Sequence, residues 1–455
     1  MLEKFNVEEN GDNLFELKNL RELRELGIDD LQKAIEGQVV SEAKLNDKEH
    51  LQIWTLRWSD KHRSNNGSPE VDEQVLDALQ PHSDLKELTL ENYMDRRSPR
   101  AKDGKTCHPL GRYPYLKSLQ LISMDSVKRV GSSAPEVGIF PSLQVLHIEV
   151  MPALEEFAGG AGTTQWLPCL ERLQISYCPG PRVFSNLPCG LKDVHIDSVG
   201  WAALPELQWQ GDNNSLRMPS TSSLSSLKIM RCEELVSLAE GLLLHPQLFT
   251  SLEKLSISYC EKLTHLPIGG FERFTSLKDL RLMGCPKLRR GSTAGKFLPP
   301  SLQFLSVYNC DALDPLPNAP AEDLNFLYNV VLRRCAIKSL PSEEVLGGWK
   351  SVKGLSINDC SEIESLGGLR ALSSLKSLAI SGCSKLVAEG QMELASTSSS
   401  SSSSSSLILD FLHIDDPALL CTLPLKSISA REVQVDFCDE ARSSSLEEWL
   451  VLSID

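Results

Sequence analysis

Cysteine recurs along this chain at nearly constant intervals. Successive members of one set of seven lie 28, 25, 25, 25, 25 and 23 residues apart: Cys232, Cys260, Cys285, Cys310, Cys335, Cys360 and Cys383. Each closes the same phrase, with apolar residues eight, five and three positions before it, as in Leu252, Leu255, Ile257 and Cys260. A motif that repeats every few tens of residues predicts an array of identical structural units, because each unit buries its apolar side only against its neighbours.

The phrase also occurs on both sides of this set, with other residues at the cysteine position. Its first apolar residue marks fourteen rows, at Leu85, Leu116, Leu143, Leu170, Leu191, Leu224, Leu252, Leu277, Leu302, Leu327, Val352, Leu375, Leu409 and Ala430. Two weaker rows at Leu23 and Leu51 extend the pattern toward the N-terminal end. The repeat therefore accounts for most of the 455 residues.

Alternation of apolar and polar residues inside the phrase predicts a β-strand with one buried face. Stacked rows then form a parallel sheet over a continuous core. After the cysteine come further leucines and a proline, as in Leu263, Leu266 and Pro267, and these leucines are expected to fill the core from the other side. The pattern is the leucine-rich-repeat signature. It predicts an α/β leucine-rich-repeat solenoid, a curved horseshoe with a parallel concave sheet and a mostly irregular or short-helical convex side.

Charge and hydropathy exclude several classes of protein. The 46 basic against 61 acidic residues give a net charge of −15, which argues against general binding to nucleic acid or anionic lipid. No run of about 18 apolar residues occurs, so no membrane insertion is expected. The charged start of the chain gives no sign of a secretory signal peptide.

No role is assigned to Cys107, Cys169, Cys189 and Cys421, which lie outside the repeat, and the others of the thirteen cysteines are interpreted as structural thiols in a reducing compartment. Their odd number does not suit a disulfide framework, and no C-x-x-C pair suggests a metal site. A search for catalytic motifs is also negative: G-x-x-x-x-G-K-[ST], G-x-G-x-x-G and H-E-x-x-H are all absent. The sequence therefore predicts no enzyme, no catalytic or metal-binding residue and no bound cofactor.

Three stretches interrupt the rhythm. We expect atypical repeats over 1–58, a polar loop over 59–84, and the solenoid over 85–455 with a disordered serine-rich insertion at 396–406. A basic stretch, Met94–Pro114, is expected to be a solvated surface loop.

Two N-terminal phrases and the form of the repeats carry a resemblance to a known family. The family is that of plant nucleotide-binding leucine-rich-repeat immune receptors, particularly the coiled-coil class of cereals. Its leucine-rich-repeat region resembles this chain at Leu252–Pro267, at Phe15–Arg24, and at Ala43–Leu51 followed by Thr55–Trp58. The family's coiled coil, P-loop and Met-His-Asp latch are absent from this sequence. The chain therefore resembles the recognition half of such a receptor, and we expect it to be a fragment or a truncated gene product.

The resemblance implies a sensor that binds a pathogen effector or a guarded host protein. It also implies contact with the receptor's nucleotide-binding and coiled-coil domains, whose switch it restrains, in the cytoplasm or nucleus. ADP or ATP would belong to the absent nucleotide-binding module. The alternatives are a substrate adaptor or scaffold for other protein–protein interactions, and a receptor ectodomain, which the missing signal peptide and missing paired-cysteine caps disfavour.

Outward positions of the predicted concave face are the candidate protein-binding residues. Tyrosine and arginine, the residue types that most often anchor protein interfaces, are frequent among them. The candidates are Tyr177, Lys228, Arg231, Tyr259, Arg281, Tyr308, Arg333 and Arg334. Earlier rows carry Glu91, Glu149 and Asp197 instead, so the face is predicted to change sign along the chain.

Overall fold

The computed structural model describes residues 1–34, 40–59, 69–79, 82–93, 113–130, 140–157, 167–179, 183–184, 187–208, 221–267, 269–290, 297–317, 324–386, 407–415 and 428–435. Contacts divide the chain into two compact units. Unit 1 is Met1–Leu224 with Arg231–Glu234, and unit 2 is Ser225–Met230 with Leu235–Asp455. The serine-rich insertion predicted at 396–406 and most of the basic loop predicted at Met94–Pro114 lie outside the described residues.

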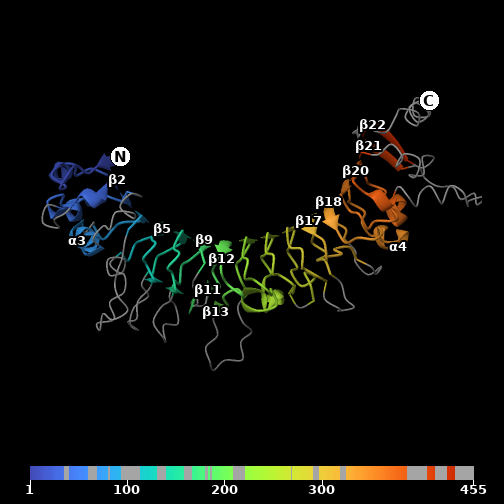
Figure 1. Cartoon of the computed structure of the whole chain (residues 1–455), viewed down its shortest axis with the longest axis horizontal. Helices are drawn as coiled ribbons and strands as arrows, with labels where there is room; N and C mark the ends of the chain where they lie inside the picture. Colours follow the sequence, from blue (N-terminus) through green and yellow to red (C-terminus); the bar gives the residue numbers. More distant parts are fainter. Residues whose placement is uncertain are drawn as a thin grey trace, which may run out of the picture. The chain divides into compact units, whose positions relative to one another are not determined.

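Unit 1 contains eight strands that pair in parallel, each with the next along the chain (Figure 1). They are β1 (Leu2–Asn6), β2 (Glu25–Asp29), β3 (Ile53–Arg57), β4 (Glu87–Glu91), β5 (Ser118–Ile122), β7 (Val145–Glu149), β9 (Arg172–Cys178) and β12 (Asp193–Val199). The two weak N-terminal rows predicted at Leu23 and Leu51 are thus confirmed as β2 and β3.

Unit 2 contains nine parallel strands paired in the same consecutive way. They are β14 (Ser226–Met230), β15 (Lys254–Ser258), β16 (Asp279–Met283), β17 (Phe304–Cys310), β18 (Asn329–Cys335), β19 (Gly354–Asn358), β20 (Ser377–Ser381), β21 (Leu407–Ile414) and β22 (Ile428–Val435). The register aligns the leucine positions, since Leu255 pairs with Leu280 and Leu280 with Leu305. The predicted leucine-rich-repeat solenoid is therefore confirmed.

Short elements occupy the connections between strands. The helices are α3 (Pro69–Leu79) and α4 (Glu343–Leu346), and the 3-10 turns are η1 (Leu14–Asn19), η2 (Leu31–Lys33), η3 (Leu45–Asp47), η5 (Gly241–Leu243), η6 (Pro246–Leu248) and η7 (Gly367–Ala371). Unit 1 adds two small parallel sheets, one of β6 (Arg129–Val130), β8 (Glu156–Phe157) and β10 (Val183–Phe184), the other of β11 (Leu187–Pro188) and β13 (Leu207–Gln208). In Figure 1, β11 and β13 lie across from the strands β9 and β12.

The structure differs from the sequence-based expectation in three places. The polar loop predicted over 59–84 contains helix α3, because Val75, Leu76 and Leu79 recur at helical spacing and are buried. The connections of unit 1 include the two small sheets, where only irregular or short-helical segments are predicted. Strand β1 precedes the first predicted row. Its pairing with β2 is irregular between Leu2 and Phe5, which explains why its pattern does not match the phrase.

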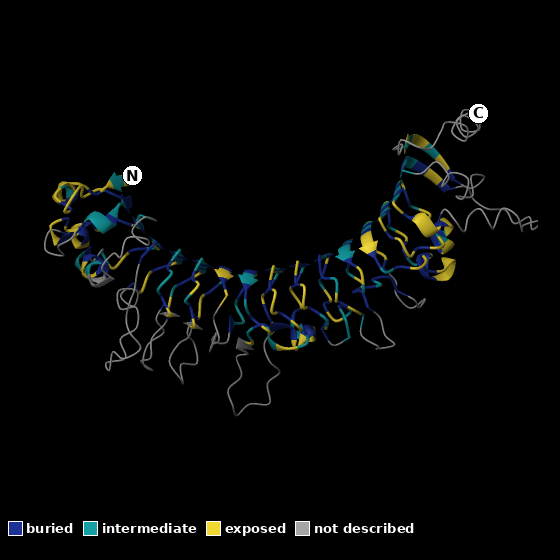
Figure 2. Cartoon of the chain, in the orientation of Figure 1, coloured by how far each residue is buried: buried dark blue, intermediate teal, exposed yellow. Residues whose placement is uncertain are grey.

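The core lies between the sheet and the connecting turns of each unit, as the dark blue residues in Figure 2 show. The strand leucines are almost fully buried, and so are the leucines after the cysteines, Leu263 and Leu313 among them. In unit 2 the turns add an aromatic column. Phe249 contacts Phe274 at 6.2 Å between ring centroids, and Phe271 contacts Phe297 at 5.6 Å. The leucines predicted to fill the core from the side opposite the sheet are thus confirmed there.

Twelve consecutive strands of the solenoid, from β4 to β20, reach a left-handed residue just before the cysteine position. In twelve consecutive rows the residue in that place has φ between 48° and 62°: Asn92, Ser123, Val150, Tyr177, Ser198, Arg231, Tyr259, Gly284, Asn309, Arg334, Asp359 and Gly382. Most of these are not glycine, so each left-handed residue costs roughly 1 kcal/mol. The recurrence in every row means that contacts of the repeat outweigh this cost each time.

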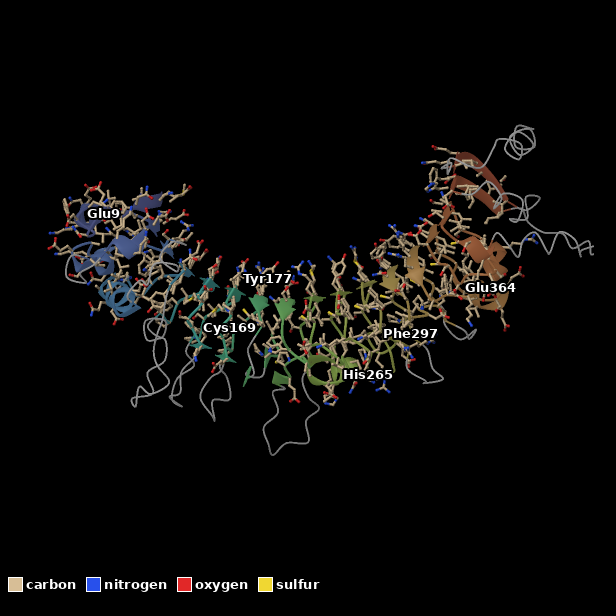
Figure 3. All side chains as sticks on the ribbon, viewed as in Figure 1. Glu9, Cys169, Tyr177, His265, Phe297 and Glu364 are labelled. Atoms are coloured by element: carbon tan, nitrogen blue, oxygen red, sulfur yellow. The ribbon has the colours of Figure 1, made fainter. Side chains whose placement is uncertain are left out.

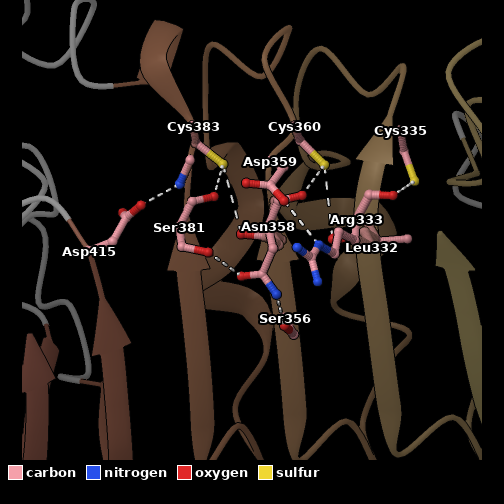
Figure 4. Close-up of polar contacts among 12 residues, drawn as sticks. Leu332, Arg333, Cys335, Ser356, Asn358, Asp359, Cys360, Ser381, Cys383 and Asp415 are labelled. Carbon is pink, nitrogen blue, oxygen red and sulfur yellow. Dashed lines mark hydrogen bonds and ion pairs between the residues drawn. The ribbon is translucent and has the colours of Figure 1, made fainter. Parts of the chain in front are cut away.

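At four strand ends one backbone carbonyl accepts two hydrogen bonds. The Met283 carbonyl accepts from the Tyr259 amide of the preceding row at 2.7 Å and from the Cys285 thiol at 3.4 Å. The Ser381 carbonyl accepts in the same way from the Asp359 amide at 2.7 Å and from the Cys383 thiol at 3.3 Å, the second of which is drawn in Figure 4. A small residue with a donor therefore suits the position below the turn, and the predicted burial of the cysteine column is confirmed.

Replacing Cys335 by aspartate tests this assignment of the repeat. The Cys335 side chain is buried among carbonyls, with Val307 O and Arg333 O both 3.4 Å from its Sγ. A carboxylate there would lack a cationic partner, so Cys335→Asp is expected to lower the free energy of unfolding by roughly 3–5 kcal/mol. The control, Cys169→Asp at an exposed cysteine, should leave the denaturation midpoint nearly unchanged. Equal midpoints for the two variants would refute the buried position of Cys335.

Candidate protein-binding surface

The exposed side of each sheet carries the outward strand residues in columns, here called the sheet face. In Figure 3, Tyr177 projects from the sheet face of unit 1, and Cys169 lies below it. The eight candidate residues all lie on the sheet faces or at their edge, but at two kinds of position. Lys228, Arg281, Tyr308 and Arg333 occupy regular strand positions, whereas Tyr177, Arg231, Tyr259 and Arg334 have the left-handed φ found at the strand ends.

The Arg231 guanidinium contacts three other side chains of unit 1. It forms an ion pair with the nearly buried carboxylate of Asp197, donates to the Ser198 hydroxyl at 3.2 Å and to the Tyr177 hydroxyl at 3.0 Å, and lies 5.6 Å from the Tyr177 ring centroid. Arg231 therefore neutralises a carboxylate that has little access to water. Its main role is structural, although the Tyr177 ring stays 46% exposed.

Other carboxylates on the sheet face of unit 1 are also paired across rows. Arg57 bridges Asp29 at 3.0 Å and Glu91 at 3.1 Å, one strand away on either side. His147 lies 3.2 Å from Glu149 within β7. These carboxylates thus have partners within the molecule, and the change of sign along the face stays a prediction.

In unit 2, Arg281 is held from two directions. Its guanidinium donates two hydrogen bonds of 2.9 Å to the Asp279 carboxylate and lies 5.0 Å from the Phe304 ring centroid. Hydrogen bonding to Asp279 raises the pKa of Arg281, so the guanidinium remains charged at all physiological pH values. The arginine therefore presents a fixed, planar cation on the sheet face.

Arg333 repeats this arrangement two strands further on. Its guanidinium lies 5.3 Å from the Tyr308 ring centroid and donates to Asp359 at 2.9 Å (Figure 4). Next to Asp359 the face becomes small and polar, where Asn358 bonds the hydroxyls of Ser356 at 2.9 Å and Ser381 at 2.8 Å. The aromatic and arginine side chains of unit 2 thus gather on β16, β17 and β18.

Three candidates are less restrained. Tyr259 is 45% exposed and packs against Gly284, where an added Cβ would approach the Tyr259 ring to 2.6 Å. Lys228 and Arg334 are exposed, and among the described residues neither forms an ion pair. These side chains can rearrange to meet a partner at little energetic cost.

The structure also reveals residues that the sequence reasoning missed. Phe304 stacks under Arg281. Two carboxylates, Asp359 and Asp197, neutralise the candidates Arg333 and Arg231. Two aromatic residues, Phe326 and Tyr328, are exposed beside β18. Exposed aromatic residues flanking a core leucine are the one sequence signal that could have located the last two. The partners of the arginines have no such signal, because each lies about a repeat away in the sequence.

Burial makes two thiols of the described residues less reactive. Burial raises the pKa of the Cys178 thiol to about 11 and that of Cys383 to about 12, so these thiols stay protonated and weakly nucleophilic. The described residues include no group of three or more histidine, cysteine, aspartate or glutamate side chains that could hold a metal ion. None of the helices in the same residues is long and apolar enough to cross a membrane.

Comparison with known proteins identifies the kind of repeat. Residues 14–151 match the family model of R13L1/DRL21 leucine-rich repeats. Disease resistance RPP13-like protein 1 of Arabidopsis thaliana is 25% identical over 386 residues, which cover 82% of this chain and 30% of that protein. Disease resistance protein RGA4 of Solanum bulbocastanum is 27% identical over 247 residues, which cover 49% of this chain and 23% of that protein.

The chain is a leucine-rich-repeat region related to plant disease resistance proteins. It spans less than a third of the length of these relatives. Neither the matched family nor the names of the relatives indicate a catalytic activity. Among solved structures, a leucine-rich-repeat protein of Leptospira interrogans covers 97% of this chain and 89% of its own, at 15% identity and a TM-score of 0.40. That likeness is too weak to assign any role.

For this leucine-rich-repeat region, Arg231→Met should separate structure from binding. The change keeps the length of the side chain but leaves the Asp197 carboxylate without its cation. Because Arg231 is itself partly exposed, we expect the free energy of unfolding to fall by about 1–3 kcal/mol. Lys228→Met, at an exposed lysine, should change it by less than about 0.5 kcal/mol. Denaturant titration of both variants measures the difference, and two equal midpoints would show that the Arg231 cluster contributes nothing.

Proposed function

We propose that this region recognises protein in plant intracellular immunity, in the cytoplasm or nucleus. It would bind a pathogen effector or a guarded host protein through the sheet face of unit 2. In a full receptor it would also contact the nucleotide-binding and coiled-coil domains and restrain their switch until a ligand arrives. The disease-resistance names of the relatives support the biological setting.

The observation that carries the proposal is the surface on β16, β17 and β18. Arg281 and Arg333 are oriented by carboxylates and aromatic rings, and Tyr308 lies between them on the middle strand. Side chains that are already ordered lose little entropy on binding, so such a surface suits a protein partner. Tyrosine and arginine are also the residue types that contribute most energy at interfaces.

Exchanging Tyr259, Arg281, Tyr308 and Arg333 for alanine should abolish partner binding and leave the fold intact. These side chains lie outside the core, so the denaturation midpoint should stay close to that of the wild type. A matched variant carries alanine at Glu261, Lys287, Arg289 and Lys338, four exposed residues of the turns after the thiols. Each protein is used to capture ligands from infected plant tissue.

At least one pathogen or host protein should be retained by the wild type and the matched variant but lost with the four-fold variant of the sheet face. The same set of proteins on all three would contradict recognition through this face. Such a result would place binding elsewhere on the chain or favour a general scaffold role.

The chain should not bind ATP or ADP. Its sequence lacks the glycine-rich loop and lysine that hold nucleotide phosphates, and the resemblance assigns that function to a module absent from this sequence. Isothermal titration with each nucleotide and Mg²⁺ should therefore give no heat of binding. Saturable binding at micromolar concentration would contradict the proposal and reveal a nucleotide site outside the known motifs.

A further inference from the structure

Two aromatic side chains project into solvent at the start of β18. Phe326 is 64% exposed and Tyr328 is 46% exposed, while Leu327 between them is fully buried. The neighbouring rows place small or polar residues at the two corresponding positions: Ser276 and Lys278, Ser301 and Gln303, Ser351 and Lys353. The repeat itself therefore does not require the aromatic pair, and its exposure calls for another explanation.

The pair is continuous with the sheet face. The Tyr328 amide donates to the Gln303 carbonyl at 2.9 Å, which places Tyr328 beside Phe304, and Phe304 is the ring under Arg281. On the other side, the Lys353 amide donates to the Tyr328 carbonyl at 2.8 Å. These hydrogen bonds set the rows of β17, β18 and β19 side by side. We give the name edge patch to Arg281, Phe304, Phe326, Tyr328 and Lys353, which lie on the adjacent rows of β16 to β19.

The edge patch contains two cations in a chain of net charge −15: Arg281, which is paired with Asp279, and Lys353. Lys353 is exposed and forms no ion pair with any described residue, whereas Lys278 pairs with Glu253 at 2.6 Å and Lys376 with Asp410 at 3.6 Å along the same edge. An unneutralised lysine beside two exposed rings matches a ligand that combines negative charge with an apolar group.

We propose that the edge patch docks an acidic segment of a protein partner through an aromatic or large apolar side chain. That side chain packs on Phe326 and Tyr328, and a neighbouring carboxylate pairs with Lys353. The inference rests on the proposed function and adds the chemistry of the partner. A nucleic acid strand fits less well, since Lys278 and Lys376 along the same edge are already paired with Glu253 and Asp410, which leaves few cations for a row of phosphates.

Fluorescence polarisation with the full chain and three labelled probes tests the proposal. The probes are a short peptide of aspartate and glutamate around a central Trp-Phe pair, the same peptide with lysine at every acidic position, and an oligodeoxythymidylate. The key variant, F326S/Y328Q, copies Ser301 and Gln303 of the preceding row, so that the repeat tolerates it. K353E reverses the unpaired charge. Y115S removes an aromatic side chain at the equivalent edge position of unit 1, where Tyr115 is also exposed.

The acidic peptide should bind the wild type and Y115S with equal affinity. Its affinity for F326S/Y328Q should be lower by a factor of at least about ten. K353E should also weaken binding of the acidic peptide. Because the lost contact is electrostatic, added salt should weaken binding of this peptide to the wild type. No binding of the acidic peptide, equal binding by F326S/Y328Q, or tighter binding of the lysine peptide or the oligonucleotide would overturn the proposal.

The outcome is separable from that of the proposed function. If F326S/Y328Q binds the peptide normally while the four-fold variant of the sheet face still loses its captured partner, only the edge patch is refuted. If the peptide binds as expected but the four-fold variant captures the same proteins as the wild type, recognition through the sheet face is refuted and the edge patch stands.

Discussion

Several strands of the repeat end on a carbonyl that joins two rows. The carbonyl accepts the amide of the left-handed residue in the preceding row and, where cysteine is present, the thiol of its own row, as at Ser176, Met283, Tyr308 and Ser381. Rows linked in this way can stack in only one register, because a shift of one residue would expose the leucines and bury the polar side chains. The left-handed conformation, the buried thiol and the alignment of the leucines all follow from this shared acceptor.

The same register determines what the sheet face can offer to a partner. Residues at one position of successive strands lie side by side, so cations and carboxylates a whole repeat apart in the sequence become neighbours. Arg57 between Asp29 and Glu91, and Arg333 beside Asp359, are examples. Many charged groups of the face are thus already satisfied within the molecule. Residues without such a pair, such as Lys228 and Arg334, retain more of their capacity to bind an external ligand.

Spacing alone predicts the fold closely, since the leucines are buried for the same reason in every row. It fails where a segment follows another rule: α3 has helical periodicity inside a polar stretch, and β1 pairs irregularly. Alternation also predicts the outward position of Lys228, Arg281, Tyr308 and Arg333, but not the partners of these side chains. The exposure of the other four candidates depends instead on the left-handed residue at the strand end. Whether Arg231 is free or bound to Asp197 depends on which residues the turns bring together, and no local pattern encodes that. The binding role of all eight candidates remains a prediction.

Thiol labelling of the native chain, located by peptide mass spectrometry, tests the shared-carbonyl register most directly. Among the cysteines that the structure describes, Cys169 is exposed and should react first, and Cys189, of intermediate exposure, should follow. The cysteines of the repeat column are buried and should stay unlabelled until denaturant unfolds their rows. They are Cys232, Cys260, Cys285, Cys310, Cys335, Cys360 and Cys383. Rapid labelling of several members of this column in the native protein, at the rate of Cys169, would contradict the register and with it the arrangement of the sheet face.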